Sequence, residues 1–400
     1  MQGRWKDLFG ASYDLLLYDL TSTYFEGEMA QAPKAQHGYS RDQRSDCRQV
    51  VIAVVLSAEG FPLAYEVMPG NTSDRTTLKW FVQKVQAPYG QARRVWIMDR
   101  GIPTEEVLAE LRPGDPPVGY WVGTPRGRWD EFKEGFGKVQ WQKLRDAVEV
   151  KRLSQGEEVY VLAKSQGRRQ KETAIRRRKL ARLLRTLRVL RRTRERPWKR
   201  DTLLHKLGAA HKEAGKAWGF VKVTVPKARQ PVNRDTFKFQ LLQDKLQDAQ
   251  ERDGHYLLRG FQAGDPARPL WERYLQLTEI EAAFKTLKSD LQLRPVRHHL
   301  ELRIEAHILV CFLAYWLSVS LRKRLQAHAP GLTPRAVRES LSGILMLDVH
   351  VPLVDGRELV MPRYTQPEAE HRLVLEKLGW QLPPQPPPRI RRAQVPEPPK

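Results

Sequence analysis

The chain has 400 residues, 41% of them hydrophobic and 9% aromatic, so most of it is expected to fold around an apolar core. Its 69 Lys and Arg against 46 Asp and Glu leave a formal charge of +23, which favours a polyanionic partner such as nucleic acid. Two cysteines, Cys47 and Cys311, do not make a disulfide framework or a structural zinc site, and this favours a cytoplasmic protein.

The first third of the chain alternates between strand and helix patterns. A β-like stretch, Tyr13–Tyr18, is predicted to end at Asp19, and a polar loop over Thr21–Asp46 follows it. Three strands, a helix, a strand, a helix and a fifth strand predict an α/β fold with a ribonuclease-H-like mixed sheet flanked by helices. The later elements are predicted as strands over Val50–Leu56, Phe61–Met68, Arg94–Met98 and Tyr120–Gly123, and helices ending near Val85 and Leu111.

A long basic insertion over residues 125–269 interrupts this rhythm. Within it, Arg176–Arg200 contains 13 Arg or Lys among 25 residues, and leucines recur at helical spacing from Leu180 to Leu190. The pattern predicts an amphipathic helix whose basic face contacts DNA phosphates. A solvated face and an anionic membrane surface are the alternative interpretations. The arginines predicted to bind DNA here are Arg178, Arg182 and Arg185.

The remaining segments complete the predicted domain organisation. The most apolar stretch, Ile308–Ser320, is too short to span a bilayer and is expected to be a buried core helix, so no membrane partner is predicted. The N-terminal ten residues do not resemble a signal peptide. Residues 1–124 and 270–330 are predicted to form one catalytic domain around the 125–269 insertion, with a helical extension over 331–380 and a disordered Pro-rich tail over 381–400.

Three acidic residues stand out as candidates for chemistry. Asp19 and Asp99 each follow a predicted strand, where catalytic side chains gather in α/β folds, although ordinary turn acids are an alternative interpretation. On a predicted helix, Trp271–Gln292, the residues Tyr274, Glu281 and Lys288 recur every seventh position and line one face beside the core stripe. Periodicity alone leaves open whether Glu281 is a metal ligand or an ordinary partner of Lys285.

The segment from Tyr274 to Lys288 resembles the Tyr–Arg–Glu–Lys signature of bacterial insertion-sequence DDE transposases of the IS-four-like group. The stretches around Asp19 and Asp99 resemble the two aspartate motifs of that group. Gly38–Asp42, Gly70–Asp74 and Leu293–His307 are also similar to it. The sequence departs from the pattern at Leu277, which occupies the position of the signature arginine, and in having only 18 residues before Asp19.

The resemblance implies a transposase that cleaves DNA and transfers the cut strand. Asp19, Asp99 and Glu281 would be the catalytic residues and would bind Mg²⁺ or Mn²⁺, as two ions about 3.5–4 Å apart. The partners would be double-stranded DNA, both element ends and target, and a second copy of the chain in a homodimer. The short N-terminus leads us to expect a truncated protein that lacks an end-recognition domain. Residues expected to contact DNA around the glutamate are Tyr274, Lys285, Lys288, Arg294 and Arg303.

Three alternatives stay open at the level of sequence. The first is an inactive transposase remnant that only binds DNA, and the second is a ribonuclease-H-like nuclease without strand transfer. The third, a basic RNA-binding structural protein, gives no reason for three acidic residues to come together.

Overall fold

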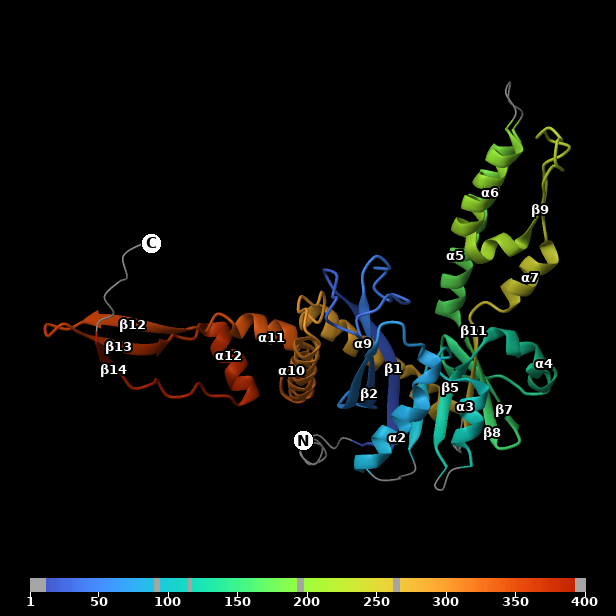
Figure 1. Ribbon diagram of the computed structural model, residues 1–400. Helices are drawn as coiled ribbons and strands as arrows, with labels where there is room; N and C mark the ends of the chain where they lie inside the picture. The colour runs from blue at the N-terminus through green and yellow to red at the C-terminus, as the bar shows by residue number, and fades with distance from the viewer. Residues whose placement is uncertain (1–11, 90–93, 114–116, 193–197, 262–266, 393–400) are drawn as a thin grey trace. The chain divides into compact units, whose positions relative to one another are not determined.

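The computed structural model describes residues 12–89, 94–113, 117–192, 198–261 and 267–392 (Figure 1). They fall into two compact units of mixed α/β structure. The first unit runs to Ile97 and resumes at Gln276, and the second is Met98–Leu275. The predicted boundaries at residues 125 and 270 therefore differ from the structure, because the second unit also takes in the segment from Met98 to Thr124.

The sheet of the first unit has the strand order β3-β2-β1-β4. Strands β1 (Leu15–Tyr24), β2 (Gln49–Ser57) and β3 (Pro62–Pro69) form an antiparallel meander. Strand β4 (Val95–Met98) lies on the other side of β1. Continuous apolar, β-branched sequence explains β2, which is buried along its whole length.

Strand β1 is longer than the sequence indicated. It continues past Asp19 to Tyr24, so the prediction that Asp19 closes the strand is wrong. Asp19 pairs with Val54, and the pairing with β2 continues as far as Tyr24. The hydroxyl residues beyond Asp19 are buried, and the Thr23 hydroxyl donates a hydrogen bond to the Leu293 carbonyl at 3.2 Å. The sequence around Thr23 does not reveal this distant partner, and its polar residues are therefore typical of a loop.

A close backbone approach and side-chain hydrogen bonds fix the segment that leads into β2. A Cβ atom on Gly38 would lie 2.1 Å from the Gly70 carbonyl oxygen, so only glycine fits there. The Gln49 side-chain amide donates hydrogen bonds to the carbonyls of Gly70 at 2.9 Å and Tyr39 at 3.1 Å. The Gly38–Asp42 and Gly70–Asp74 motifs are therefore packed against each other. The Arg41 guanidinium also bonds both carboxylate oxygens of Asp74, each at 2.6 Å.

Helix α9 (Leu277–Lys285) packs against β1 and continues into a π-helical turn, η4 (Thr286–Asp290). The prediction of a single helix over Trp271–Gln292 is wrong. The helix is interrupted at Gln276, where the second unit ends and the first unit resumes. Helix α8 (Ala267–Leu275) belongs to the second unit. A π-helical turn changes the angle between successive side chains, so seven-residue spacing no longer keeps Glu281 and Lys288 on one face.

Helix α10 (Glu301–His328) is the one helix among the described residues that is long and apolar enough to cross a membrane by length and composition. It extends well beyond the apolar stretch Ile308–Ser320. One face, with Ile308 and Phe312, is buried in the first unit, whereas Leu302 and Leu317 on the other face are exposed. The prediction of a buried core helix therefore holds for one face only.

The C-terminal part departs most from prediction. A helical extension was expected over 331–380, but strands β12 (Met346–Pro352) and β13 (Arg357–Tyr364) form a hairpin there. An Asp-Gly turn connects them, with Gly356 at φ +79°, which is a hairpin signal in the sequence. Strand β14 (Arg389–Arg392) pairs with β13 inside the predicted disordered tail, and residues 393–400 lie outside the described residues. The flanking helices are α11 (Pro334–Leu341) and α12 (Ala369–Leu378).

In the second unit an antiparallel sheet has the order β5-β11-β8-β7-β6. A helical hairpin of α5 (Gln166–Arg191) and α6 (Arg200–Ala214) follows β8, and leucines from both helices form its core. Helix α5 corresponds to the predicted amphipathic helix but begins at Gln166 rather than Arg176.

The strands of the second unit are β5 (Gly119–Thr124), β6 (Gln142–Arg145), β7 (Val148–Gln155), β8 (Glu158–Ser165), β9 (Val221–Thr224), β10 (Lys238–Leu241) and β11 (His255–Phe261). The remaining helices are α2 (Leu78–Tyr89) of the first unit and α3 (Glu105–Leu111), α4 (Trp129–Gly137) and α7 (Gln243–Glu251) of the second.

Candidate active site and nucleic-acid interface

The two predicted catalytic aspartates lie on, or directly after, neighbouring strands. Asp19 lies in the middle of β1 and is partly buried, and its Oδ1 accepts a hydrogen bond from the Leu20 backbone N–H at 2.8 Å. Asp99 directly follows β4 and is exposed, and its Oδ1 accepts one from the Arg100 backbone N–H at 2.8 Å. Strands β1 and β4 are adjacent in the sheet. The backbone positions of the two aspartates are therefore set by these strands.

The predicted catalytic glutamate is on α9, the helix that packs against β1. Glu281 is exposed, and of the residues the structure describes, none forms a hydrogen bond or ion pair with its carboxylate. The alternative of an ordinary Glu281–Lys285 pair is therefore not what the structure contains. The neighbouring acid Glu279, in contrast, accepts a hydrogen bond from Arg322 at 3.0 Å.

The structure leaves the three-acid metal site as a prediction. Asp19 and Glu281 belong to the first unit and Asp99 to the second. Across the described ranges, no group of three His, Cys, Asp or Glu side chains is arranged to hold a metal ion. Carboxylate oxygens are nevertheless the hard donors that Mg²⁺ and Mn²⁺ prefer, and the exposed Glu281 carboxylate has no hydrogen-bond or ion-pair partner in the described part of the chain.

Tyr274, on α8, lies beside Asp99 within the second unit. Its hydroxyl donates to Asp99 Oδ1 at 3.4 Å, and a Cβ on Gly123 would come within 2.8 Å of the Tyr274 hydroxyl oxygen. Its ring stacks on Tyr256 with centroids 6.4 Å apart. Burial raises the pKa of the Tyr274 phenol, and the negative charge of Asp99 adds to the shift. The phenol therefore stays protonated and acts as a donor at neutral pH.

The signature lysine is inside an ion-pair cluster of the first unit. The Lys288 ammonium donates to Asp42 Oδ1 at 2.8 Å, and the Arg294 guanidinium donates to the same oxygen. Burial lowers the pKa of the Lys288 ammonium, and the hydrogen bond to Asp42 opposes this shift. Lys285 and Arg303 are exposed. Sequence reasoning did not assign a role to Asp42, and the only signal was its place in the Gly38–Asp42 motif.

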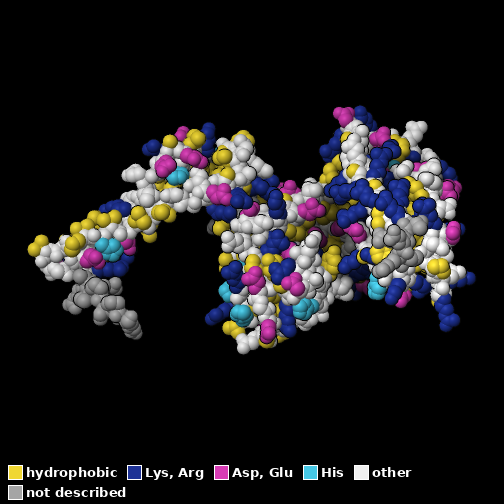
Figure 2. Space-filling view, turned by 90° about the horizontal axis from the view of Figure 1, so that it is seen from above, with side chains coloured by type: hydrophobic (Ala, Val, Ile, Leu, Met, Phe, Trp, Pro, Cys, Tyr) yellow, Lys and Arg dark blue, Asp and Glu magenta, His cyan; other side chains and the backbone are white. Residues whose placement is uncertain are grey.

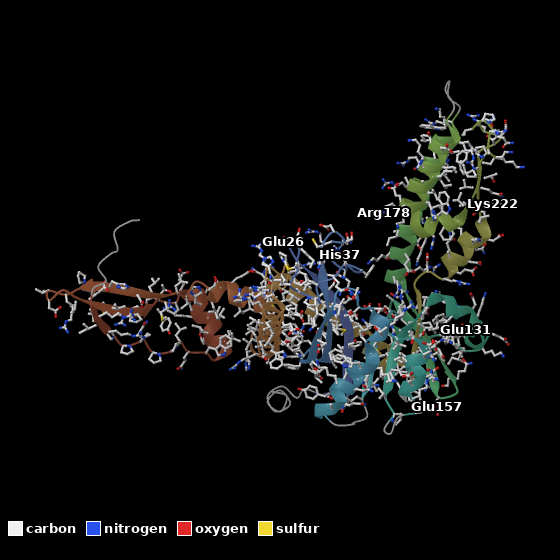
Figure 3. The ribbon with its side chains drawn as sticks, in the orientation of Figure 1. Glu26, His37, Glu131, Glu157, Arg178 and Lys222 are labelled. Carbon is white, nitrogen blue, oxygen red and sulfur yellow. The ribbon has the colours of Figure 1, made fainter. Side chains whose placement is uncertain are left out.

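Lysine and arginine side chains gather over the α5–α6 part of the second unit, as Figure 2 shows. Arg178, labelled in Figure 3, and Arg185 are exposed on α5, and Arg182 is exposed and paired with Glu213. Arg176 differs from them, because it pairs with the buried Asp253 and so stabilises the fold. Of the predicted phosphate contacts on α5, all three therefore remain accessible to a ligand.

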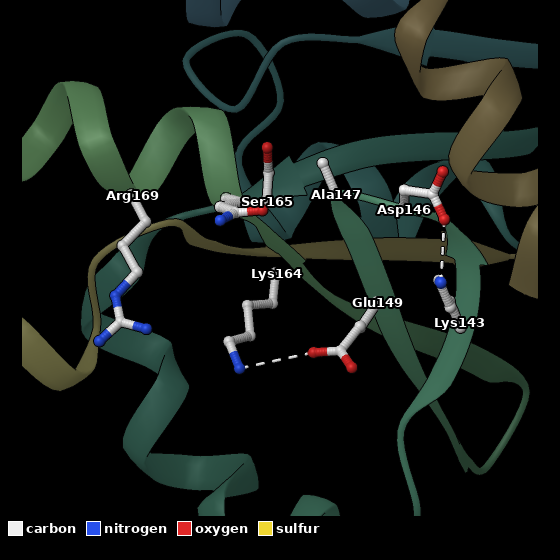
Figure 4. A pocket seen from close by; sticks show the side chains of 8 residues that line it. Lys143, Asp146, Ala147, Glu149, Lys164, Ser165 and Arg169 are labelled. Carbon is white, nitrogen blue, oxygen red and sulfur yellow. Dashed lines mark hydrogen bonds and ion pairs between the residues drawn. The ribbon is translucent and has the colours of Figure 1, made fainter.

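The second unit also contains a cavity of about 740 Å³ beside α5 with a strongly basic lining. Its two acids, Glu172 and Asp253, are paired with Arg168 and Arg176. A smaller cavity, of about 280 Å³, is different in kind (Figure 4). There Lys164 pairs with Glu149 and Lys143 with Asp146, so its charges largely neutralise one another. The cations of the larger cavity are Arg100, Arg168, Arg176, Lys179, Lys216 and Arg252.

Comparison with known proteins identifies the family. The family model described as transposase DDE domain matches residues 11–317, well over half of the sequence. The chain belongs to the transposase DDE domain family. No curated protein matches it.

Two solved structures of transposases were also matched. One is a piggyBac transposase synaptic complex with hairpin DNA, at 12% identity and a TM-score of 0.27, covering 86% of this chain and 59% of that one. The other is a Mos1 transposase paired-end complex with the left transposon end, at 16% identity and a TM-score of 0.18, covering 27% and 35%. The chain therefore spans less than two thirds of the length of either matched protein.

Proposed function

We propose that this chain is an insertion-sequence transposase that cleaves DNA at the ends of its element and joins the free 3′ end to target DNA. The observation that supports it best is that the family match includes all three predicted acids. Asp19 lies on β1, Asp99 directly follows the neighbouring strand β4, and Glu281 lies on a helix packed against β1. The strand order β3-β2-β1-β4 supports the ribonuclease-H-like fold that we propose for the catalytic domain.

Asp19, Asp99 and Glu281 would hold two divalent ions, Mg²⁺ or Mn²⁺. Such ions, when bound, activate an attacking oxygen and stabilise the departing one. The protein's own contribution is to fix the acids on rigid elements and to supply donors around them. In the second unit, the Tyr274 hydroxyl donates to Asp99 and is itself restrained by its stacking on Tyr256.

DNA would bind along exposed cations of both units. In the first unit these are the exposed Lys285 and Arg303 and the partly exposed Arg294, and in the second unit the α5 arginines and the basic cavity beside them. Phosphate contacts position a duplex without reading its sequence. The proposal includes a homodimer on DNA, as the resemblance implies.

A cleavage and joining assay tests this function. Labelled duplex carrying the parent element's ends is incubated with the protein in Mg²⁺ or Mn²⁺, with EDTA as the blank, and products are resolved by size. We expect metal-dependent nicks at the element ends and joined products with target DNA. Nicks without joined products would favour a nuclease, and binding without nicks would favour an inactive remnant.

The α5 arginines should set part of the salt dependence of DNA binding. Each lost phosphate contact removes about 0.9 units from the slope of log affinity against log salt concentration. Changing Arg178, Arg182 and Arg185 together to Gln is therefore expected to reduce the slope by about two to three units. The affinity for unrelated duplexes should fall about equally. Fluorescence anisotropy at five or more salt concentrations, in EDTA, measures both.

A matched control removes the same charge elsewhere in the second unit. Lys133 on α4, Lys138 directly after α4 and Lys143 on β6 are exposed, and their combined change to Gln should leave the slope nearly unchanged. An equal fall in slope for both triple variants would show that α5 acts only through the overall charge of the protein.

A further inference from the structure

The carboxylate of Asp42 is buried between two cations. Its side chain is 3% exposed, and Oδ1 alone accepts hydrogen bonds from both Lys288 and Arg294. Oδ2 is buried, and among the described residues nothing donates to it. Burying an ionised carboxylate costs desolvation free energy unless the carboxylate is paired. The two cations on Asp42 offset this cost.

The backbone around Asp42 is held from several sides. The Arg41 N–H donates to the Ser22 hydroxyl of β1 at 3.2 Å, and the Arg41 side chain is bonded to Asp74. The motif begins at Gly38, which is locked against Gly70 by the close approach described above. The Asp42 carboxylate is therefore a fixed anchor, and the longer side chains that reach it take their position from it.

The two cations on Asp42 differ in what they present to solvent. The Lys288 side chain is 10% exposed and that of Arg294 is 34% exposed. A guanidinium carries five N–H donors in a planar fork, so Arg294 can bond Asp42 with one edge and a phosphate with another. An ammonium as buried as that of Lys288 would have to leave Asp42 to reach a phosphate. Two cations against one anion leave the cluster with a net positive charge directed outward at Arg294.

We propose that Asp42 is a positioning residue that holds Arg294 toward the DNA backbone, with Lys288 as the buried counter-ion that keeps the carboxylate in place. This inference rests on the proposed function, since it assumes that DNA passes this face of the first unit. It assigns the phosphate contact of the cluster to Arg294 rather than to the signature lysine.

DNA binding in EDTA tests the proposal without requiring cleavage. Asp42→Asn removes an acid, and the simple electrostatic effect would be tighter binding. Positioning predicts the opposite: weaker binding and a salt slope reduced by about one unit, as for Arg294→Gln. The double variant should show no further fall, because the two residues act through one contact. Lys288→Met should change the slope by much less than Arg294→Gln.

Asp46→Asn is the matched control, because Asp46 is an exposed acid of the same segment that pairs with Arg44. It should leave the slope unchanged. Tighter binding by Asp42→Asn, or additive losses in the double variant, would overturn the proposal. If Asp42→Asn does not fold, the single variants still decide, since a loss of one unit with Lys288→Met and none with Arg294→Gln contradicts it. If the variants change DNA binding as expected but the wild-type protein never cleaves DNA, the proposed function is refuted and the positioning role of Asp42 stands.

Discussion

Replacing Asp19, Asp99 or Glu281 singly by the corresponding amide is expected to lower metal-dependent DNA cleavage by about a thousandfold or more. An amide keeps the shape of the side chain but removes the negative charge that attracts a divalent cation. A thousandfold loss corresponds to about 4 kcal/mol of transition-state stabilisation, a plausible share of what a two-metal site supplies. Single-turnover cleavage of a labelled end-containing duplex in Mg²⁺ measures the rate.

DNA affinity measured in EDTA should change little, which separates a catalytic defect from a binding defect. Glu279→Gln is the matched control for Glu281→Gln, because both acids lie on α9 and, among the described residues, Glu279 is ion-paired with Arg322 whereas Glu281 has no such partner. Its cleavage rate should stay within about threefold of wild type. A fully active Glu281→Gln protein would remove this residue from the proposed site and leave the two aspartates without their third ligand.

Gly70→Ala is expected to destabilise the first unit by about 3 kcal/mol or more, at the upper end of what overpacking costs. The added Cβ would lie 2.0 Å from the Gln49 carbonyl oxygen and 2.3 Å from that of Gln36. Neither carbonyl can yield easily, because Gln36 and Gln49 exchange two backbone hydrogen bonds of 3.0 Å. Urea unfolding followed by circular dichroism measures the loss.

Gly208→Ala is the control for this prediction. Gly208 is inside helix α6, and a Cβ there would meet nothing within 4 Å. Alanine is favoured over glycine in a helix interior by about 0.5–1 kcal/mol, so this variant should be slightly more stable than wild type. A Gly70→Ala protein as stable as wild type would mean that the 34–49 segment can move away, and the anchoring of Asp42 would then need another explanation.

The sequence by itself determined the elements whose signals are local. Strand β2 was predicted over Val50–Leu56 and lies over Gln49–Ser57, and helix α3 ends at Leu111 as predicted. Apolar alternation, helical spacing and turn residues act over about ten residues, so they can be recognised without the rest of the chain. The basic, leucine-spaced helix α5 was predictable for the same reason. The three candidate acids came from their places beside such elements together with a family resemblance.

Only the tertiary structure decided where β1 ends, because the buried hydroxyls of Ser22 and Thr23 resemble loop residues until their distant partners are known. It also broke the predicted helix at Gln276 and placed Tyr274 and Glu281 in different units. The Asp42–Lys288 hydrogen bond joins residues 246 positions apart. No periodicity links residues so far apart, because their contact exists only once η4 and the loop after β1 have packed together. Lys288, predicted to contact DNA, is thus paired with an acid to which the sequence assigned no role.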